Sequence, residues 1–254
     1  MKLSRLIIII SLLAGCASPG GGSEGTPQQD TTNAQARARV HTELAASYYD
    51  RTQYGVALQE IGVALQAEPD FAPAYNVRAM IRMALQEDGK ADDDFQHSLK
   101  LDDRNSNTHN NYGWFLCQRG HTKEGIKQFQ DALNNPLYAS PEAAYVNLGL
   151  CSLKAGMLKE AESNLQRALI LRPDMPQALY GLANLGLAKG NYTAANDYFR
   201  RFEQQVPELN AEQLWLAVRI QRKLQDYNSE ASYAMQLRKR FPDSQETQRM
   251  LNGK

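Results

Sequence analysis

The fold is decided by a stretch in the middle of the chain, which reads Ala161-Glu-Ser-Asn-Leu165-Gln-Arg-Ala168-Leu-Ile-Leu-Arg-Pro173. A small residue in such a segment lets two antiparallel helices approach closely, a large one fills the neighbouring hole, and the proline ends the helix. The same pattern recurs 34 residues later, where the four numbered residues correspond to Ala195, Phe199, Phe202 and Pro207. Earlier copies are Ala57, Ile61, Ala64 and Pro69, followed by Ala91, Phe95, Ser98 and Asp103. The chain is therefore an array of similar helical units.

A pair of a large and a small residue also recurs in the first half of the units. The pairs are Leu44-Ala45, Tyr112-Gly113, Leu148-Gly149, Leu182-Ala183 and Leu216-Ala217. The period and both patterns resemble the tetratricopeptide repeat, a helical hairpin whose open apolar face is covered by the next hairpin. The resemblance implies an all-α fold, a right-handed superhelix of six repeats, and an irregular helical bundle is the alternative. We place the repeat domain at 37–251, with repeats at 38–71, 72–105, 106–139, 142–175, 176–209 and 210–243.

Some residues depart from the regular repeat. Arg78 and Arg82 stand where apolar residues are usual, so we expect the first helix of the second repeat to be partly polar. Gly125 stands in an alanine position of the third repeat. After the sixth repeat, Asp243 with Glu246 three residues later is typical of a capping box. This pair predicts a short C-terminal helix that caps the last apolar face.

The N-terminal segment has the pattern of an export signal. Two basic residues precede an apolar run from Leu6 to Leu13, about half of the ~20 residues that a membrane-spanning helix needs. The run ends in Leu-Ala-Gly-Cys16, which resembles the lipobox of bacterial lipoproteins. The resemblance implies that residues 1–15 are removed and that Cys16 carries lipid on its thiol and amine. Many Gram-negative lipoproteins with Asp at the next position stay in the inner membrane, so Ala17 favours the outer membrane. A plain secretory peptide with an incidental cysteine is the alternative.

Residues 16–36 comprise the lipidated cysteine and a linker that we expect to be disordered, because from Ala17 to about Asn33 the chain has nothing apolar to bury. The full sequence has 28 basic and 28 acidic residues. Removal of residues 1–15 takes away two basic ones, so the net charge of the remaining chain is 26 − 28 = −2. That balance predicts no nucleic-acid partner. Beyond the signal, no apolar run is long enough to cross a membrane. We therefore expect a soluble body tethered to the periplasmic face of the outer membrane.

No motif predicts catalysis or metal binding. A metal site needs three or four converging ligands, whereas the histidines fall in different repeats. They are His41, His97, His109 and His121. Asp92-Asp93-Asp94 lacks the alternating oxygen ligands of a calcium loop, and no nucleophile motif is paired with a base. We expect no enzyme activity, no metal, no cofactor and no small-molecule substrate.

Cys117 and Cys151 lie on the first helices of consecutive repeats, where stacking brings those helices side by side. Export places both in an oxidising compartment, and they remain as an even pair once Cys16 is lipidated. They predict a disulfide that staples the junction where Ser140-Pro141 interrupt the period. Two buried free thiols are the alternative.

The tetratricopeptide resemblance also implies a concave groove lined by the first helix of each repeat. The lining positions select Tyr49, Asn76, Met80, Met83, Asn107, Asn110, Trp114, Gln118, Val146, Leu150, Leu153, Tyr180, Asn184 and Leu187. Exposed Met, Trp and Leu among amides are typical of a peptide groove, and Trp114 is our first choice as an anchor. The alternative is that individual residues of this set pack between repeats.

The lipobox, the short linker and the six repeats together resemble the type IV pilus biogenesis lipoproteins known as PilF or PilW, which act as pilotins. The likeness includes the run from Asn110 to Cys117 and the run Ala231-Ser232-Tyr233. It implies a non-enzymatic adaptor that helps the pilus secretin reach the outer membrane or multimerise, and so supports pilus biogenesis and twitching motility. A capped array has no need to dimerise, so we expect a monomer. A scaffold lipoprotein that organises peptidoglycan enzymes or other envelope machinery is the alternative. An envelope hydrolase is disfavoured by the missing catalytic motif.

Overall fold

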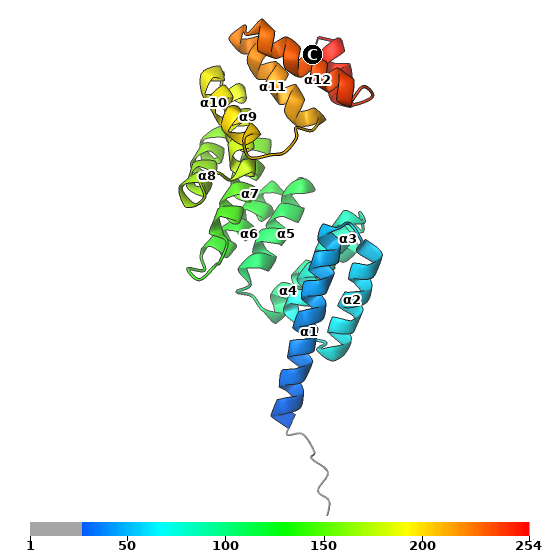
Figure 1. Ribbon diagram of the computed structural model, residues 1–254. Coiled ribbons are helices and arrows are strands. Elements are labelled where there is room, and N and C mark those ends of the chain that lie inside the picture. Colours follow the sequence, from blue (N-terminus) through cyan, green and yellow to red (C-terminus); the bar gives the residue numbers. More distant parts are fainter. Residues whose placement is uncertain (1–26, 254) are drawn as a thin grey trace, which may run out of the picture.

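The computed structural model describes residues 27–253. The predicted signal peptide, Cys16 and the linker up to residue 26 lie outside the described residues. The described chain is a curved array of helices, with α1 at one end and α13 at the other (Figure 1). The helices are α1 (Pro27–Asp50), α2 (Tyr54–Ala67), α3 (Ala72–Ala84), α4 (Asp88–Leu101), α5 (Ser106–Gln118), α6 (Thr122–Leu133), α7 (Pro141–Lys154), α8 (Leu158–Leu171), α9 (Pro176–Ala188), α10 (Tyr192–Glu203), α11 (Ala211–Leu224), α12 (Tyr227–Arg240) and α13 (Gln245–Leu251).

Each of the six predicted repeats contains one pair of these helices, joined as an antiparallel hairpin. The paired helices approach closely because a small residue faces the partner helix. A Cβ atom added to Gly149 on α7 would lie 2.7 Å from Cγ of Leu165 on α8. In the third repeat, a Cβ atom on Gly125 would lie 2.8 Å from the carbonyl oxygen of Gly113. Glycine therefore replaces the usual alanine at position 125 because α5 and α6 leave no room for a methyl group.

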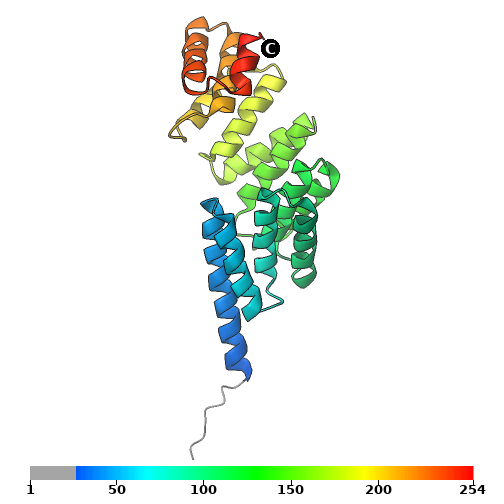
Figure 2. The same ribbon diagram turned by 90° about the vertical axis from the view of Figure 1, so that its right-hand side faces the viewer.

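The array curves because one row of helices is packed more closely than the other. Successive first helices contact one another from α1 through α3, α5 and α7 to α9, whereas no contact of similar extent joins successive second helices. The first helices consequently lie on the inner side of the curve, with α6, α8 and α10 outside (Figure 1). In the turned view, the direction of the helices changes gradually from one repeat to the next (Figure 2). This arrangement gives the molecule an inner face of first helices and an outer face on which successive second helices pack less closely.

The N-terminal end differs from the prediction. The linker was predicted to extend to residue 36, but α1 begins at Pro27, so the prediction is wrong for residues 27–36. A segment without apolar residues can still lengthen a helix, because adding a residue to an existing helix is far easier than nucleating one. Proline is tolerated in the first turn, and Ala34 and Ala36 are strong helix formers.

The C-terminal helix α13 is present, but its cap is one residue later than predicted. Ser244, and not Asp243, caps it, with the amide of Thr247 donating to Oγ of Ser244 at 3.1 Å. The hydroxyl of Thr247 donates in turn to the carbonyl of Phe241 at 2.7 Å, which ties α13 to the end of α12. Among the helices of residues 27–253, none has the length and apolar character that crossing a membrane requires.

Candidate functional site

The inner face is bridged from repeat to repeat by asparagine side chains. The amide of Asn111 on α5 donates to Oδ1 of Asn76 on α3 at 3.2 Å. One junction further on, the amide of Asn147 on α7 donates to Oδ1 of Asn110 on α5 at 3.0 Å. Both bonds join equivalent positions: the acceptors are 110 − 76 = 34 residues apart, and the donors are 147 − 111 = 36 apart because Ser140-Pro141 add two residues between them. We call these four residues the asparagine ladder.

The ladder stops where the fifth repeat begins, because neither partner is polar there. Val146 takes the position of the accepting asparagine, and Gly181 takes that of the donor. The space next to Gly181 is filled by Leu150, whose Cδ2 would lie 2.9 Å from an added Cβ. The bridging asparagines are therefore confined to α3, α5 and α7.

The structure brings the residues predicted from the repeat pattern to this face, and most of them also pack into the array. Asn76 and Asn110 are buried, each 8% exposed, because the ladder covers them, and Val146 is buried as well. Asn107 is exposed. The other members are half-buried, namely Tyr49, Met80, Met83, Trp114, Gln118, Leu150, Leu153, Tyr180, Asn184 and Leu187. Several of these residues pack between repeats, as the alternative interpretation predicts, and part of their surface remains accessible to solvent.

Trp114 and Tyr180 illustrate this double role. Trp114 packs against the buried cluster that contains Phe129 and Leu148. The ring of Tyr180 lies 5.3 Å from that of Phe202, and burial raises the pKa of Tyr180 to about 12. Its backbone carbonyl accepts from the amide of Asn184 at 3.1 Å. These groups can offer apolar contact and hydrogen bonds to a peptide, and within residues 27–253 no cluster of His, Cys, Asp or Glu could hold a metal ion.

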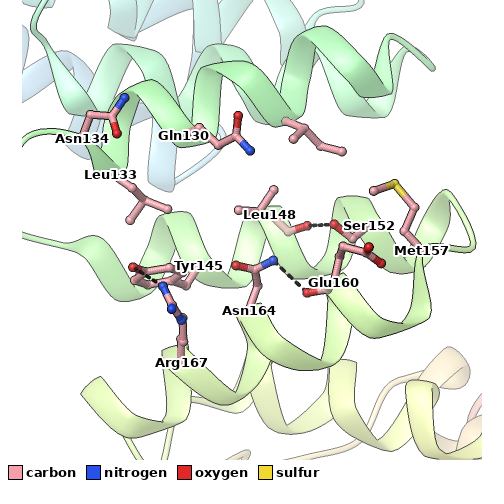
Figure 3. A pocket seen from close by; sticks show the side chains of 11 residues that line it. Gln130, Leu133, Asn134, Tyr145, Leu148, Ser152, Met157, Glu160, Asn164 and Arg167 are labelled. Atoms are coloured by element: carbon pink, nitrogen blue, oxygen red, sulfur yellow. Dashed lines mark hydrogen bonds between the residues drawn. The ribbon is translucent and has the colours of Figure 1, made fainter.

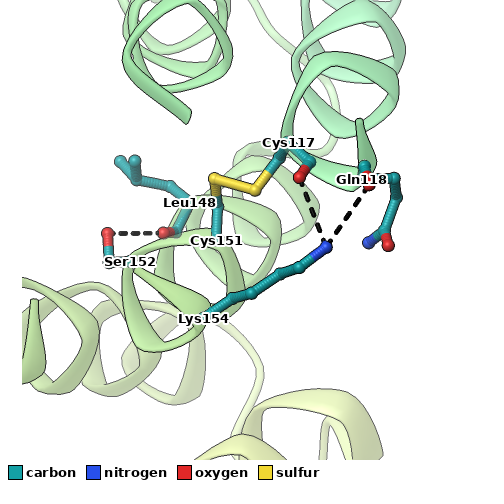
Figure 4. The surroundings of a disulfide bond; sticks show 6 residues. All are labelled: Cys117, Gln118, Leu148, Cys151, Ser152 and Lys154. Atoms are coloured by element: carbon teal, nitrogen blue, oxygen red, sulfur yellow. Dashed lines mark hydrogen bonds between the residues drawn. A yellow bond between two sulfur atoms is a disulfide. The ribbon is translucent and has the colours of Figure 1, made fainter. Parts of the chain in front are cut away.

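A disulfide fixes the junction between the third and fourth repeats. It joins Cys117 on α5 to Cys151 on α7, with the two Cα atoms 5.9 Å apart and each residue only 1% exposed. Beside it, Nζ of Lys154 donates to the carbonyl oxygens of Cys117 and Gln118, both at 3.4 Å (Figure 4). The last turn of α5 is thereby attached to α7 by a covalent bond and by a cation placed at a helix C-terminus, where cations are favoured.

Two features were not identified from the sequence. The first is a buried ion cluster, in which Asp94 on α4 accepts from both Arg78 and Arg82 on α3. The signal was available, since both arginines were noted at apolar positions, but their common partner was not. The second is the exposure of three apolar side chains on the first repeat, Val40, Leu44 and Val56. Within residues 27–253, no repeat precedes the first one to cover this end of the array.

Comparison with known proteins gives consistent likenesses. A tetratricopeptide-repeat family model matches residues 153–210. The type IV pilus assembly protein PilF of Pseudomonas aeruginosa is 28% identical over 246 residues, 96% of this chain and 96% of PilF. The crystal structure of PilW, a widely conserved type IV pilus biogenesis factor, is 34% identical with a TM-score of 0.77 and covers 84% of this chain and 98% of its own. The solved structure of Pseudomonas aeruginosa pilF is 27% identical with a TM-score of 0.77, covering 87% of this chain and 100% of its own. The predicted all-α tetratricopeptide superhelix is confirmed.

Proposed function

Because the chain belongs to the PilF/PilW family of tetratricopeptide-repeat proteins of type IV pilus biogenesis, we propose that it acts as a non-catalytic, pilotin-like adaptor for the pilus secretin. In this role it delivers the secretin to the outer membrane or promotes its multimerisation. The lipid on Cys16 supplies the attachment to the periplasmic face of that membrane, and the array supplies the contact with the secretin. Pilus assembly and twitching motility depend on both.

The observation that carries this proposal is the inner face. It follows the first helices, with asparagine bridges between α3, α5 and α7 and half-buried apolar side chains such as Met80, Trp114 and Leu153 beside them. Amides such as Asn107, which is exposed, and Gln118, which is half-buried, can hydrogen-bond to a peptide backbone, and apolar side chains such as Trp114 and Leu153 anchor its side chains. A segment of the secretin can therefore bind along the face without any reacting group being required.

The decisive experiment is deletion of the gene followed by gel analysis of unheated membranes. The secretin multimer, which resists dissociation without heating, is expected to be lost or to leave the outer membrane, and surface pili are expected to be lost with it. Normal secretin multimers and normal pili in the deletion strain would reject the pilotin role and leave the scaffold of peptidoglycan or other envelope machinery as the alternative.

A narrower experiment tests the inner face itself. Trp114→Ala is expected to weaken binding of purified secretin about ten-fold or more, as for a hot-spot tryptophan. Because Trp114 also packs against Phe129 and Leu148, thermal unfolding must show that the array remains folded. Gln166→Ala, on the exposed surface of α8, is the control and should bind as the unmodified protein does. Full affinity of a folded Trp114→Ala variant would remove Trp114 from the site.

A further inference from the structure

A cleft recurs on the outer face at three junctions where a second helix meets the next repeat. Between the second and third repeats it encloses about 410 Å³, and between the third and fourth about 390 Å³. Between the fourth and fifth it shrinks to about 40 Å³. The walls are equivalent, since Leu148 lines the second cleft and Leu182, with 182 − 148 = 34, lines the third. The size of the cleft therefore depends on which side chains occupy a few fixed positions.

The small cleft is closed by the protein's own side chains. Tyr198 on α10 lines it and packs against the apolar clusters of both adjoining repeats. Lys189 crosses it to reach Glu162 at 2.7 Å. The cleft between the second and third repeats is crossed in the same way, by the ion pair of Arg119 with Asp88. Each of these clefts thus has an intramolecular partner across its mouth.

The cleft between the third and fourth repeats has no such closure, and we call it the α6/α8 cleft. Asn164 takes the position of Tyr198, with 198 − 164 = 34, and is shorter. Its amide turns back to the carbonyl of Glu160 on its own helix at 2.7 Å (Figure 3). Ala155 stands where the next repeat has Lys189, so this position cannot supply an ion pair across the cleft. The space that the ring of Tyr198 fills between the fourth and fifth repeats therefore stays open in the α6/α8 cleft.

The groups around the α6/α8 cleft define what fits it. Ile126, Leu133 and Leu148 supply apolar surface, and the thioether of Met157 lies at one end (Figure 3). Thioethers and aromatic rings attract each other.

The rim of the cleft carries two opposite charges. Within the described residues, neither Glu160 nor Arg167 forms an ion pair, and the nearest polar partner of Arg167 is the hydroxyl of Tyr145 at 3.4 Å. They are 167 − 160 = 7 residues apart on α8, or about 10 Å along the helix. That distance corresponds to roughly three residues of an extended peptide.

We propose that the α6/α8 cleft is a second docking site, which takes an aromatic side chain from an extended segment of a protein partner. The ring occupies the volume that Tyr198 fills in the neighbouring junction. A basic residue on one side of the aromatic pairs with Glu160, and an acidic residue on the other side pairs with Arg167. The site lies on the outer face, so a partner can bind here while the inner face is occupied.

The test uses the blocked peptide acetyl-Gly-Lys-Tyr-Ser-Glu-Gly-amide and the detergent-solubilised full chain with ¹³C-labelled methionine methyl groups. The Met157 signal should shift saturably, while those of Met80 and Met83 on the inner face stay in place. A peptide with Ala in place of Tyr should cause no saturable shift. Equal shifts with both peptides, or shifts confined to Met80 and Met83, would overturn the proposal.

Matched variants connect binding to the cleft. Asn164→Tyr installs the residue that fills the next cleft, and it should reduce peptide affinity about ten-fold or more. Gln166→Tyr adds the same ring outside the cleft, on the exposed surface of α8, and should bind as the unmodified protein does. Unchanged affinity of Asn164→Tyr would overturn the proposal. Self-association that this change abolishes, without any peptide binding, would overturn it in favour of a second copy of the chain.

A charge reversal tests the rim without disturbing the fold, because Glu160 is exposed. Replacing the lysine of the peptide by glutamate should weaken binding about three-fold, the effect of an exposed ion pair. Glu160→Lys should restore the affinity for that acidic peptide. Failure of this variant to improve binding would remove the proposed charge complementarity. Because these measurements do not involve the secretin, their failure is distinguishable from failure of the pilotin role.

Discussion

At the scale of single residues, the least expected feature is a charged side chain in the core. Asp94 is 3% exposed and accepts hydrogen bonds from Nε and Nη2 of Arg78 at 2.9 and 2.7 Å and from Nη1 of Arg82 at 2.7 Å. The hydrogen bond to Asp94 raises the pKa of Arg78. Both arginines keep about a quarter of their side-chain surface in solvent, so only the carboxylate is fully withdrawn from water.

Asp94→Asn should lower the free energy of unfolding by about 2–3 kcal/mol, because two partly buried cations lose their counter-ion. The apolar triple variant Arg78→Leu, Arg82→Leu and Asp94→Leu should lie within about 1 kcal/mol of the unmodified protein, since the desolvation of all three charges is avoided. Urea denaturation followed by circular dichroism measures both. A triple variant less stable than Asp94→Asn would show that the ion cluster stabilises the fold in its own right.

Tyr112 gives a prediction on pH. Burial and the hydrogen bond from its hydroxyl to Asp92, at 2.8 Å, raise its pKa to about 12, whereas an unfolded tyrosine has a pKa near 10. The folded pKa is the higher one, so this stabilisation is complete below about pH 10 and is lost as the pH rises towards 12. In an alkaline titration followed by tyrosinate absorbance, Tyr112→Phe should remove part of the late phase. A late phase of unchanged amplitude in Tyr112→Phe would contradict this prediction.

At the scale of the helices, the spacing within a hairpin is set by glycines that are not interchangeable. Gly149→Ala places a methyl group 2.7 Å from Leu165, and overpacking of this kind costs about 1–3 kcal/mol. Gly62, on the exposed side of α2, has nothing within 4 Å of an added Cβ. Gly62→Ala should therefore stabilise the protein by about 0.5–1 kcal/mol. Thermal unfolding of the two variants should give shifts of opposite sign, and equal signs would contradict the packing argument.

The disulfide between α5 and α7 is expected to contribute to the stability of the fold. It closes a sequence separation of 34 residues, so its loss should cost about 3–4 kcal/mol by the chain-entropy model. Reductant should lower the melting temperature of the unmodified protein and leave that of the Cys117→Ala, Cys151→Ala variant unchanged. Denatured, unreduced mature protein should contain no reactive thiol, and two titratable thiols would show that the cysteines are free.

The sequence was sufficient for the features that repeat. Small residues such as Gly149, the bounds of the hairpins and the row of inner positions follow from a period that each repeat shares. It was insufficient where one residue departs from the pattern and its partner lies in another helix. The sequence shows that Arg78 and Arg82 occupy positions that are usually apolar. Only the folded chain shows that both arginines donate hydrogen bonds to Asp94. The α6/α8 cleft was missed for a similar reason, because it is defined by the short side chain of Asn164 in one repeat.

The helix boundaries show a further limit at the N-terminal end. Composition separates residues that can form a core from residues that cannot, and by this measure residues 27–36 belong to a linker. Whether such residues join a helix depends on the helix that follows them. The part of α1 that packs against α2 supplies the nucleus, and the preceding polar residues extend it.

At the scale of the whole molecule, the proposed lipid and the array have separable roles. Cys16→Ser should leave the melting temperature and the affinity for the secretin unchanged, because Cys16 precedes the repeats that form the fold. Membrane fractionation should find the variant released from the outer membrane, and secretin multimers there should decrease. A variant that still delivers its partner to the outer membrane would break the link between anchoring and function.

The disulfide also decides how the molecule responds to a cut in its chain. The loop between α6 and α7 carries Leu137, which is 88% exposed and is therefore accessible to a protease. Cys117 precedes this loop and Cys151 follows it, so the disulfide spans the cleavage site. A single nick would leave the two halves of the array covalently joined and would become visible on a gel only after reduction. In the presence of a protease, such a molecule can be cleaved once without being divided.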